Sequence, residues 1–167
     1  MSDHEFFHYK SLDSAHSRRV SYLIDTKNRG PRLNDTIVNL GKFIRPEDEL
    51  IIADGASTDS TEEVVLRNRN VVHIFLSEKD MSAHHALNKA VLLARGKYII
   101  FLPDDDRLHA DGVDRAVEVM EKNSDIDLLV CGGIKHFKVS HTSRPFYYGP
   151  GMNYGSTVEH AFTYGKC

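Results

Sequence analysis

Short apolar runs alternate along this chain with segments in which apolar residues recur every three or four positions. The first pattern is typical of buried strands and the second of amphipathic helices. The expected strands are residues 20–24, 50–53, 71–76, 98–102 and 128–130. The expected helices are residues 33–44, 60–67, 83–94 and 111–122.

This alternation of strands and helices, with short connections, predicts a single α/β domain with a mostly parallel sheet flanked by helices. Residues 1–19 are polar and lack periodicity, so we expect a mobile arm or a short helix there. Residues 20–133 carry the alternating pattern and form the expected core. Beyond residue 133 the pattern gives way to Gly, Pro, Tyr and His, and residues 134–167 are expected to be an irregular tail.

The composition, net charge and missing motifs of the chain count against several classes of function. The 167 residues are 41% hydrophobic and 27% charged, as in ordinary globular domains. A net charge of −3 and the absence of a basic run give no support for nucleic-acid binding. The chain has no P-loop, G-x-G-x-x-G, H-E-x-x-H or G-x-S-x-G sequence, which counts against the chemistries that those motifs serve.

The sequence also bears on location. No stretch reaches the roughly 18 apolar residues of a membrane helix, and the polar start does not resemble a secretory signal. Two cysteines are too few for a disulfide framework, and Cys131 follows an apolar run that we expect in the core. We therefore expect a reducing, cytoplasmic setting, with peripheral membrane association left open.

Three consecutive aspartates follow the strand expected at residues 98–102. After Pro103 come Asp104, Asp105 and Asp106. Adjacent carboxylates repel one another unless a cation lies between them, and ligands of open α/β sheets bind beyond the carboxyl ends of strands. This pattern indicates a Mg²⁺ or Mn²⁺ site for a diphosphate ligand. The alternative is an Asp-rich turn that leads into the next helix.

Other polar loops follow the other expected strands and should converge on the same edge of the sheet. They are residues 25–29, Asp54 and residues 78–80. Asp54 either forms a turn with Gly55 or accepts a hydrogen bond from a nucleotide base. Lys27 and Arg29 either neutralise phosphate or are simply solvated.

The order of these segments resembles family 2 of the glycosyltransferases, an inverting group with the GT-A fold, over residues 20–133. The segments that carry the resemblance are residues 25–29, 51–59, 77–80, 86–90, 94–99 and 101–106. Residues 51–59 resemble the family's "V-V-D-D-G-S-T-D", and residues 101–106 lie where the family has its metal-binding D-x-D. Each segment alone is weakly specific, whereas all of them in this order make a specific match.

The resemblance implies a GT-A (Rossmann-like) fold and transfer of a sugar, with inversion, from a UDP-sugar to an acceptor hydroxyl on a saccharide or a lipid-linked molecule. It implies Mg²⁺ or Mn²⁺ as cofactor, bound by Asp105 and Asp106. The residues that it implies for the donor nucleotide are Thr26, Asn28, Arg29, Asp54, Asp80 and Asp104.

The chain departs from the family pattern in several places. It has Lys27 for a base-stacking tyrosine, Ala53 for an aspartate, Met81 for a glycine and Pro103 for an acid. The acceptor hydroxyl must lose a proton to a positioned base, and no residue matches the family's base, with Glu159 as a weak substitute. The alternatives are therefore a nucleotide-sugar-binding module without turnover and, less favoured, a nucleotidyltransferase.

Overall fold

A computed structural model of the chain describes residues 6–9, 18–137 and 142–146. Its internal contacts divide the chain into two units, residues 1–107 and residues 108–167. The sequence pattern predicted one domain over residues 20–133.

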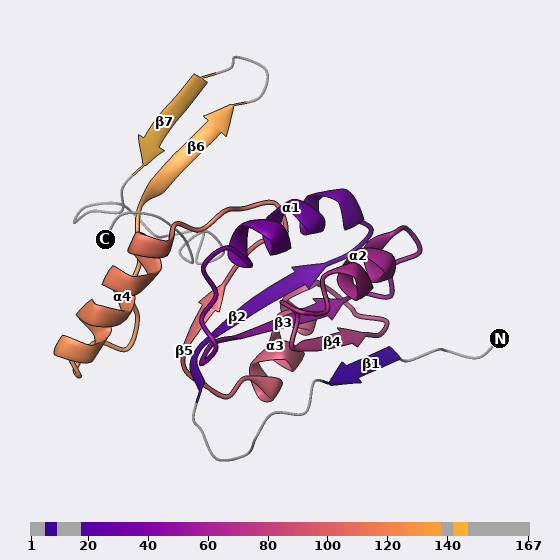
Figure 1. The fold of residues 1–167 in the computed structure, drawn as a ribbon, viewed down its shortest axis with the longest axis horizontal. Coiled ribbons are helices and arrows are strands. Elements are labelled where there is room, and N and C mark those ends of the chain that lie inside the picture. Colours follow the sequence, from indigo (N-terminus) through magenta and orange to yellow (C-terminus); the bar gives the residue numbers. More distant parts are fainter. Residues whose placement is uncertain (1–5, 10–17, 138–141, 147–167) are drawn as a thin grey trace. The chain divides into compact units, whose positions relative to one another are not determined.

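The first unit is a five-stranded sheet with helices on both faces (Figure 1). Its strands are β1 (Phe6–Tyr9), β2 (Arg18–Thr26), β3 (Glu49–Asp54), β4 (Ile74–Ser77) and β5 (Gly96–Phe101), in the spatial order β1-β4-β3-β2-β5. All neighbours pair in parallel except β1, which is antiparallel to β4. The predicted α/β class with a mostly parallel sheet is confirmed.

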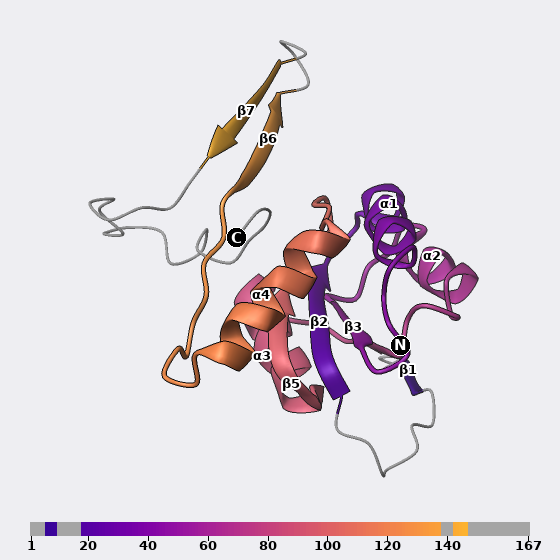
Figure 2. The same cartoon turned by 60° about the vertical axis from the view of Figure 1, so that its left-hand side comes forward.

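Three helices cover this sheet: α1 (Gly30–Leu40), α2 (Thr61–Arg67) and α3 (Ala83–Leu93). Helices α1 and α2 lie side by side on one face, and α3 packs against β2 and β3 on the other (Figures 1 and 2). The core under α3 consists of Leu23, Ile51, Ala53, Ile74, Ala86 and Ala90. Two alanines on the inner face of α3 let its backbone approach the sheet closely. On the other face, α1 buries Leu33, Ile37 and Leu40.

The order in which the chain adds strands to the sheet reverses at β2. The chain proceeds from β2 to β3 and β4 on one side, and then returns to place β5 on the other side of β2. Open α/β sheets bind ligands at such a reversal, beyond the carboxyl ends of the strands. The Leu102 amide donates to the Leu23 carbonyl (2.9 Å), so β5 is held against β2 up to the residue before Pro103.

A buried carboxylate holds the start of β5 at the amino-terminal end of the parallel strands. Glu49 Oε1 accepts hydrogen bonds from Ser21 Oγ (2.5 Å) and from the Arg95 amide (2.7 Å). Ser21 Oγ in turn accepts one from the Gly96 amide (2.8 Å). A Cβ at Gly96 would lie only 2.5 Å from the Ser21 nitrogen, so the two strands can approach this closely only with glycine here. These contacts fix the position at which β5 begins.

The second unit contains α4 (Ala110–Lys122) and an antiparallel pair, β6 (Gly133–Phe137) and β7 (Thr142–Phe146). The prediction of a strand at residues 128–130 is wrong. Those residues are irregular and the Leu128 side chain is 57% exposed. Apolar character alone does not make a strand, because its backbone needs a partner. Strand pairing begins only at residue 133, the last residue of the predicted core, and continues into the segment predicted to be an irregular tail.

Other boundaries also differ from the sequence prediction. Residues 6–9, predicted to be part of a mobile arm or a short helix, form β1 by backbone pairing with β4. Helix α1 ends at Leu40 rather than at residue 44, and β4 begins at Ile74 rather than at residue 71. Cys131, predicted to be a core residue, is half-buried. None of the helices in the described residues is long and apolar enough to cross a membrane.

Candidate active site

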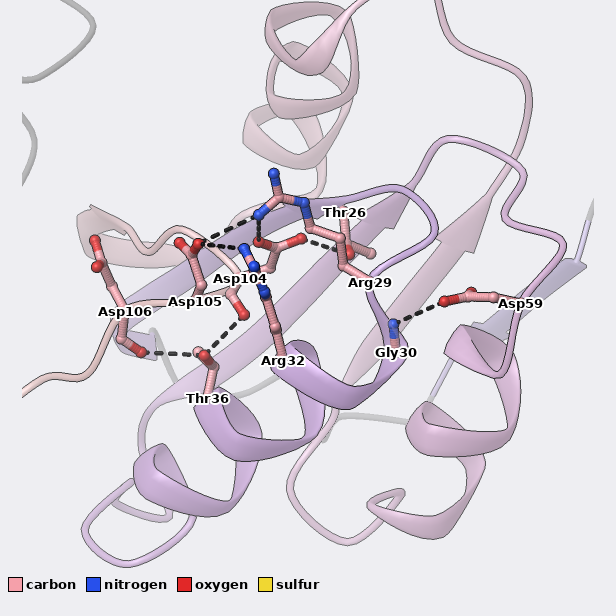
Figure 3. Close-up of polar contacts among 9 residues, drawn as sticks. All are labelled: Thr26, Arg29, Gly30, Arg32, Thr36, Asp59, Asp104, Asp105 and Asp106. Atoms are coloured by element: carbon pink, nitrogen blue, oxygen red, sulfur yellow. Dashed lines mark hydrogen bonds and ion pairs between the residues drawn. The ribbon is translucent and has the colours of Figure 1, made fainter. Parts of the chain in front are cut away.

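The aspartate triplet forms a turn that two threonines hold in place beyond the end of β5 (Figure 3). Thr26, the last residue of β2, donates from Oγ1 to Asp104 Oδ2 (2.8 Å). Thr36 of α1 places its Oγ1 3.0 Å from the Asp104 carbonyl oxygen and 3.1 Å from that of Asp106, and shares its hydrogen between them. The Asp104 side chain is buried, and the hydrogen bonds from Thr36 fix the backbone around Asp105.

Two arginines from the start of α1 neutralise this turn. Arg29 Nη1 lies 3.4 Å from Asp104 Oδ1 and 3.2 Å from Asp105 Oδ2, and Arg32 Nη1 lies 3.2 Å from the same Asp105 oxygen. The side chains of Arg29, Arg32 and Asp105 are 46%, 55% and 44% exposed. Ion pairs this exposed contribute about 0–1 kcal/mol each. The Asp106 carboxylate lies on the side of Asp105 away from the arginines (Figure 3).

Burial and like charges shift the pKa of two carboxyl groups at this edge. Burial raises the pKa of Asp104, against the opposing effects of the Thr26 hydrogen bond and the Arg29 charge. Burial, followed by the negative charge of Asp104, raises the pKa of Asp25, and Asp80 adds to the effect. Asp25 therefore lies within the electrostatic reach of the acidic turn, a role that the sequence did not assign to it.

Asp54 and Asp80 form a second acidic group at the ends of β3 and β4. The buried Asp54 carboxylate accepts hydrogen bonds from the Ser57 amide (2.9 Å), from the Ser57 hydroxyl and from Ser77 Oγ (2.6 Å). Asp80 lies over Gly55, since a Cβ on that glycine would be 2.5 Å from Asp80 Oδ2. Lys27 Nζ is 4.0 Å from Asp80 Oδ1.

Asn28 links the loops that follow β2 and β3. It adopts a left-handed backbone conformation (φ 53°). Its amide donates to Ser57 Oγ (2.7 Å), and its Oδ1 accepts from the Thr58 amide (2.8 Å). The Gly30 amide donates to Asp59 Oδ2 (3.0 Å), which adds a further link. These bonds give Asn28 a structural task, and its predicted contact with a nucleotide stays a prediction.

Most of the residues singled out from the sequence thus lie along one edge of the sheet. Thr26, Arg29, Asp104 and Asp105 are joined by direct contacts, and Thr36 connects Asp106 to them. Sequence reasoning missed Arg32 and Thr36. Their spacing of three and seven residues from Arg29 puts all three on one face of a helix, but the spacing does not show which loop that face meets. Glu159 lies outside the described residues.

The acidic turn can hold a divalent metal only with help from a ligand. Within the described part of the chain, no group of three or more His, Cys, Asp or Glu residues is placed to hold a metal ion. Mg²⁺ sites often use one or two carboxylates and complete their coordination with phosphate oxygens and water. The half-exposed Asp105 and its neighbour Asp106 fit that kind of site.

The chain matches the model of the family described as "Glycosyl transferase family 2" over residues 21–161. The match covers most of the chain, and this protein therefore belongs to glycosyl transferase family 2. The predicted family is confirmed.

Relatives of this chain include longer glycosyltransferases. TuaG of Bacillus subtilis, named for teichuronic acid biosynthesis, is 30% identical over 108 residues, which are 63% of this chain and 43% of TuaG. The poly(ribitol-phosphate) β-N-acetylglucosaminyltransferase TarS of Staphylococcus aureus is 25% identical over 122 residues, which are 70% of this chain and 21% of TarS. The chain thus spans less than half the length of these relatives.

Solved structures share the fold. Residues 1–349 of S. aureus TarS, in complex with UDP, match 72% of this chain and 36% of that chain with a TM-score of 0.61 at 21% identity. The mannosyltransferase PcManGT of Pyrobaculum calidifontis, in complex with GDP-Man and Mn²⁺, matches 77% of this chain and 38% of that chain with a TM-score of 0.58 at 23% identity. The fold is the GT-A, Rossmann-like fold that the sequence predicted.

Proposed function

We propose that this chain binds a nucleotide-diphosphate sugar, with UDP-sugars preferred, and provides the donor side of a metal-dependent inverting glycosyl transfer to an acceptor hydroxyl. The observation that carries the proposal is the fixed Asp104–Asp105 turn at the switch point between β2 and β5, beside two arginines. Family membership supports the reaction class. TarS has been crystallised with UDP and with UDP-GlcNAc, which supports the uridine donor.

In this proposal Asp105 and Asp106 are the protein ligands of Mg²⁺ or Mn²⁺. The metal would neutralise charge on the diphosphate as it leaves, a kind of electrostatic help that is often the largest catalytic term. PcManGT and a mycobacterial glucosyl-3-phosphoglycerate synthase were both crystallised with Mn²⁺ and a nucleotide, which supports this assignment. Asp104 stays in the protein interior and orients the turn through Thr26.

The donor nucleotide would lie along the carboxyl edge of the sheet. We assign Asp54 to the base, because its carboxylate is held at the end of β3 by Ser57 and Ser77. The remaining donor-side residues are Thr26, Asn28, Arg29 and Asp80. The predicted saccharide or lipid-linked acceptor and the cytoplasmic location remain parts of the proposal.

The transfer itself requires a base. The acceptor oxygen forms a bond to the anomeric carbon, the bond from that carbon to the diphosphate breaks, and the hydroxyl proton passes to a base. No residue in the described part of the chain matches the family's base. The second candidate function, a module that binds a nucleotide-sugar without turnover, needs no such base.

An assay for free UDP separates the two functions. The chain is incubated with Mn²⁺ and each of a panel of UDP-sugars, with and without saccharide acceptors. Sustained UDP release that EDTA abolishes is the result expected of a transferase. Saturable UDP binding with no release above the rate of the sugar nucleotide alone would identify a binding module.

A further inference from the structure

One oxygen of Asp105 is in contact with two positive charges. Its Oδ2 atom lies 3.2 Å from the Nη1 atoms of both Arg29 and Arg32. A metal ion bound to either oxygen of this carboxylate would lie close to both guanidinium groups. Because a divalent cation and two guanidinium groups repel one another at this range, the metal ion and the two arginines compete for Asp105.

The arginines also border an open hollow with a volume of about 370 Å³, lined by Asn28, Arg29, Pro31 and Arg32. The hollow therefore adjoins the acidic turn, and its charged groups are two guanidinium groups. Arginine suits phosphate because its planar group donates several hydrogen bonds at once. A ligand that carries phosphate therefore suits this hollow better than a neutral ligand does.

Backbone amides do not supply this anion site. At the start of α1 the Gly30 amide already donates to Asp59, and Pro31 has no amide hydrogen. The amides of Arg32 and Leu33 both donate to the Arg29 carbonyl (3.0 Å each). The arginine side chains are therefore the charged donors that the hollow offers to an anion.

We propose that Arg29 and Arg32 exchange partners when the donor binds: they neutralise Asp105 in the ligand-free protein and bind the diphosphate once a divalent ion occupies Asp105. The inference rests on the proposed function and adds Arg32 as a diphosphate-binding residue. The arginines oppose binding of the metal alone and favour binding of metal and diphosphate together. Such coupling between two ligands is reciprocal.

The variant Arg32→Gln tests the exchange by two affinities that change in opposite directions. Mn²⁺ alone, titrated by calorimetry, binds more tightly to Arg32→Gln than to the wild type, by about threefold or more, because one competing cation is gone. UDP, titrated in saturating Mn²⁺, binds about tenfold more weakly, because a charge-assisted hydrogen bond is lost. The Arg32 side chain is 55% exposed, so the core is not disturbed.

The matched control is Arg67→Gln, which removes the same charge from the exposed last turn of α2 and leaves both affinities unchanged. A loss of both affinities in Arg32→Gln, or no change in either, overturns the exchange. Tighter Mn²⁺ binding with unchanged UDP binding also overturns it, because Arg32 would then contact only Asp105. A wild-type chain that binds neither Mn²⁺ nor UDP overturns the proposed function as well, which separates the two failures.

Discussion

Asp25 is a residue of this site whose ionised form is disfavoured by its surroundings. It is the penultimate residue of β2, half-buried, and close enough to Asp104 for the two negative charges to interact. Burial and the Asp104 charge both raise its pKa above the ordinary value of 3.8. The folded chain therefore holds this proton more tightly than the unfolded chain does.

The variant Asp25→Asn should differ from the wild type in how its free energy of unfolding changes with pH. A raised pKa in the folded state means that stability is present below the ordinary value and is lost as the pH rises through the raised one. The wild type should therefore lose stability relative to Asp25→Asn as the pH rises above the ordinary pKa of 3.8 and through the raised pKa of the folded state. Urea unfolding at several pH values measures the difference in free energy of unfolding. The variant should be the more stable protein at pH 7, by a margin that narrows toward pH 4.

Asp35→Asn removes an exposed carboxylate from α1 and controls for the change in net charge. A difference between Asp25→Asn and the wild type that stays constant with pH would contradict the raised pKa of Asp25.

Sequence reasoning succeeds for residues at strand ends and fails for residues defined by packing. Asp54 and Asp105 could be found because each closely follows an apolar run. Arg32 and Thr36 lie inside a helix and reach the acidic turn only because α1 packs beside it. No local pattern states which loop a helix will face, although the shared helical face of these residues is visible afterwards.

At the level of secondary-structure elements, α1 and the residue before it hold the acidic turn of Asp104, Asp105 and Asp106 in place. Arg29, Arg32 and Thr36 are spaced three and four residues apart and all contact the segment from Asp104 to Asp106 (Figure 3). Thr36 is buried and its hydroxyl is the contact that fixes the backbone of this segment. The orientation of Asp105 therefore depends on a helix that is far from it in the sequence.

The variant Thr36→Val keeps the shape of the side chain and removes its hydroxyl. Two carbonyl oxygens lose their shared donor, so the free energy of unfolding should fall by about 1–2 kcal/mol. UDP affinity in Mn²⁺ should fall several-fold, because the turn is less well held. Thr36→Ser keeps the hydroxyl and should retain most of that affinity. If the valine and serine variants bind UDP equally well, Thr36 contributes packing only.

Elements with their own strong pattern were predicted well, and elements defined by pairing were not. The apolar periodicity of α3 and the apolar run of β3 lie within a residue of their observed bounds. β1 and the hairpin of β6 and β7 exist because backbone groups find a partner strand. Residues 128–130 have apolar side chains but no such partner in the described structure, and they remain irregular.

At the level of the whole molecule, the residues assigned to the donor come from one of the two units. The residues that would bind the metal and the nucleotide lie in the unit of residues 1–107. The chain spans 43% of TuaG and 21% of TarS, so the activities of those longer proteins come to this chain only as proposals. We therefore expect Asp105, through a divalent ion, to make this chain bind a nucleoside diphosphate.

Calorimetric titration of UDP into the full chain measures whether Asp105 and a divalent ion are required for binding. It is run with Mn²⁺, with EDTA, and on the variant Asp105→Asn, with Asp111→Asn in the first turn of α4 as the matched control. We expect the wild type and Asp111→Asn to bind UDP in Mn²⁺. Binding should be at least about tenfold weaker in EDTA, with an equal loss in Asp105→Asn, because the bridging cation is then missing. UDP binding that is equally tight in EDTA, or that survives the Asp105 substitution, would contradict the metal-bridging role of Asp105.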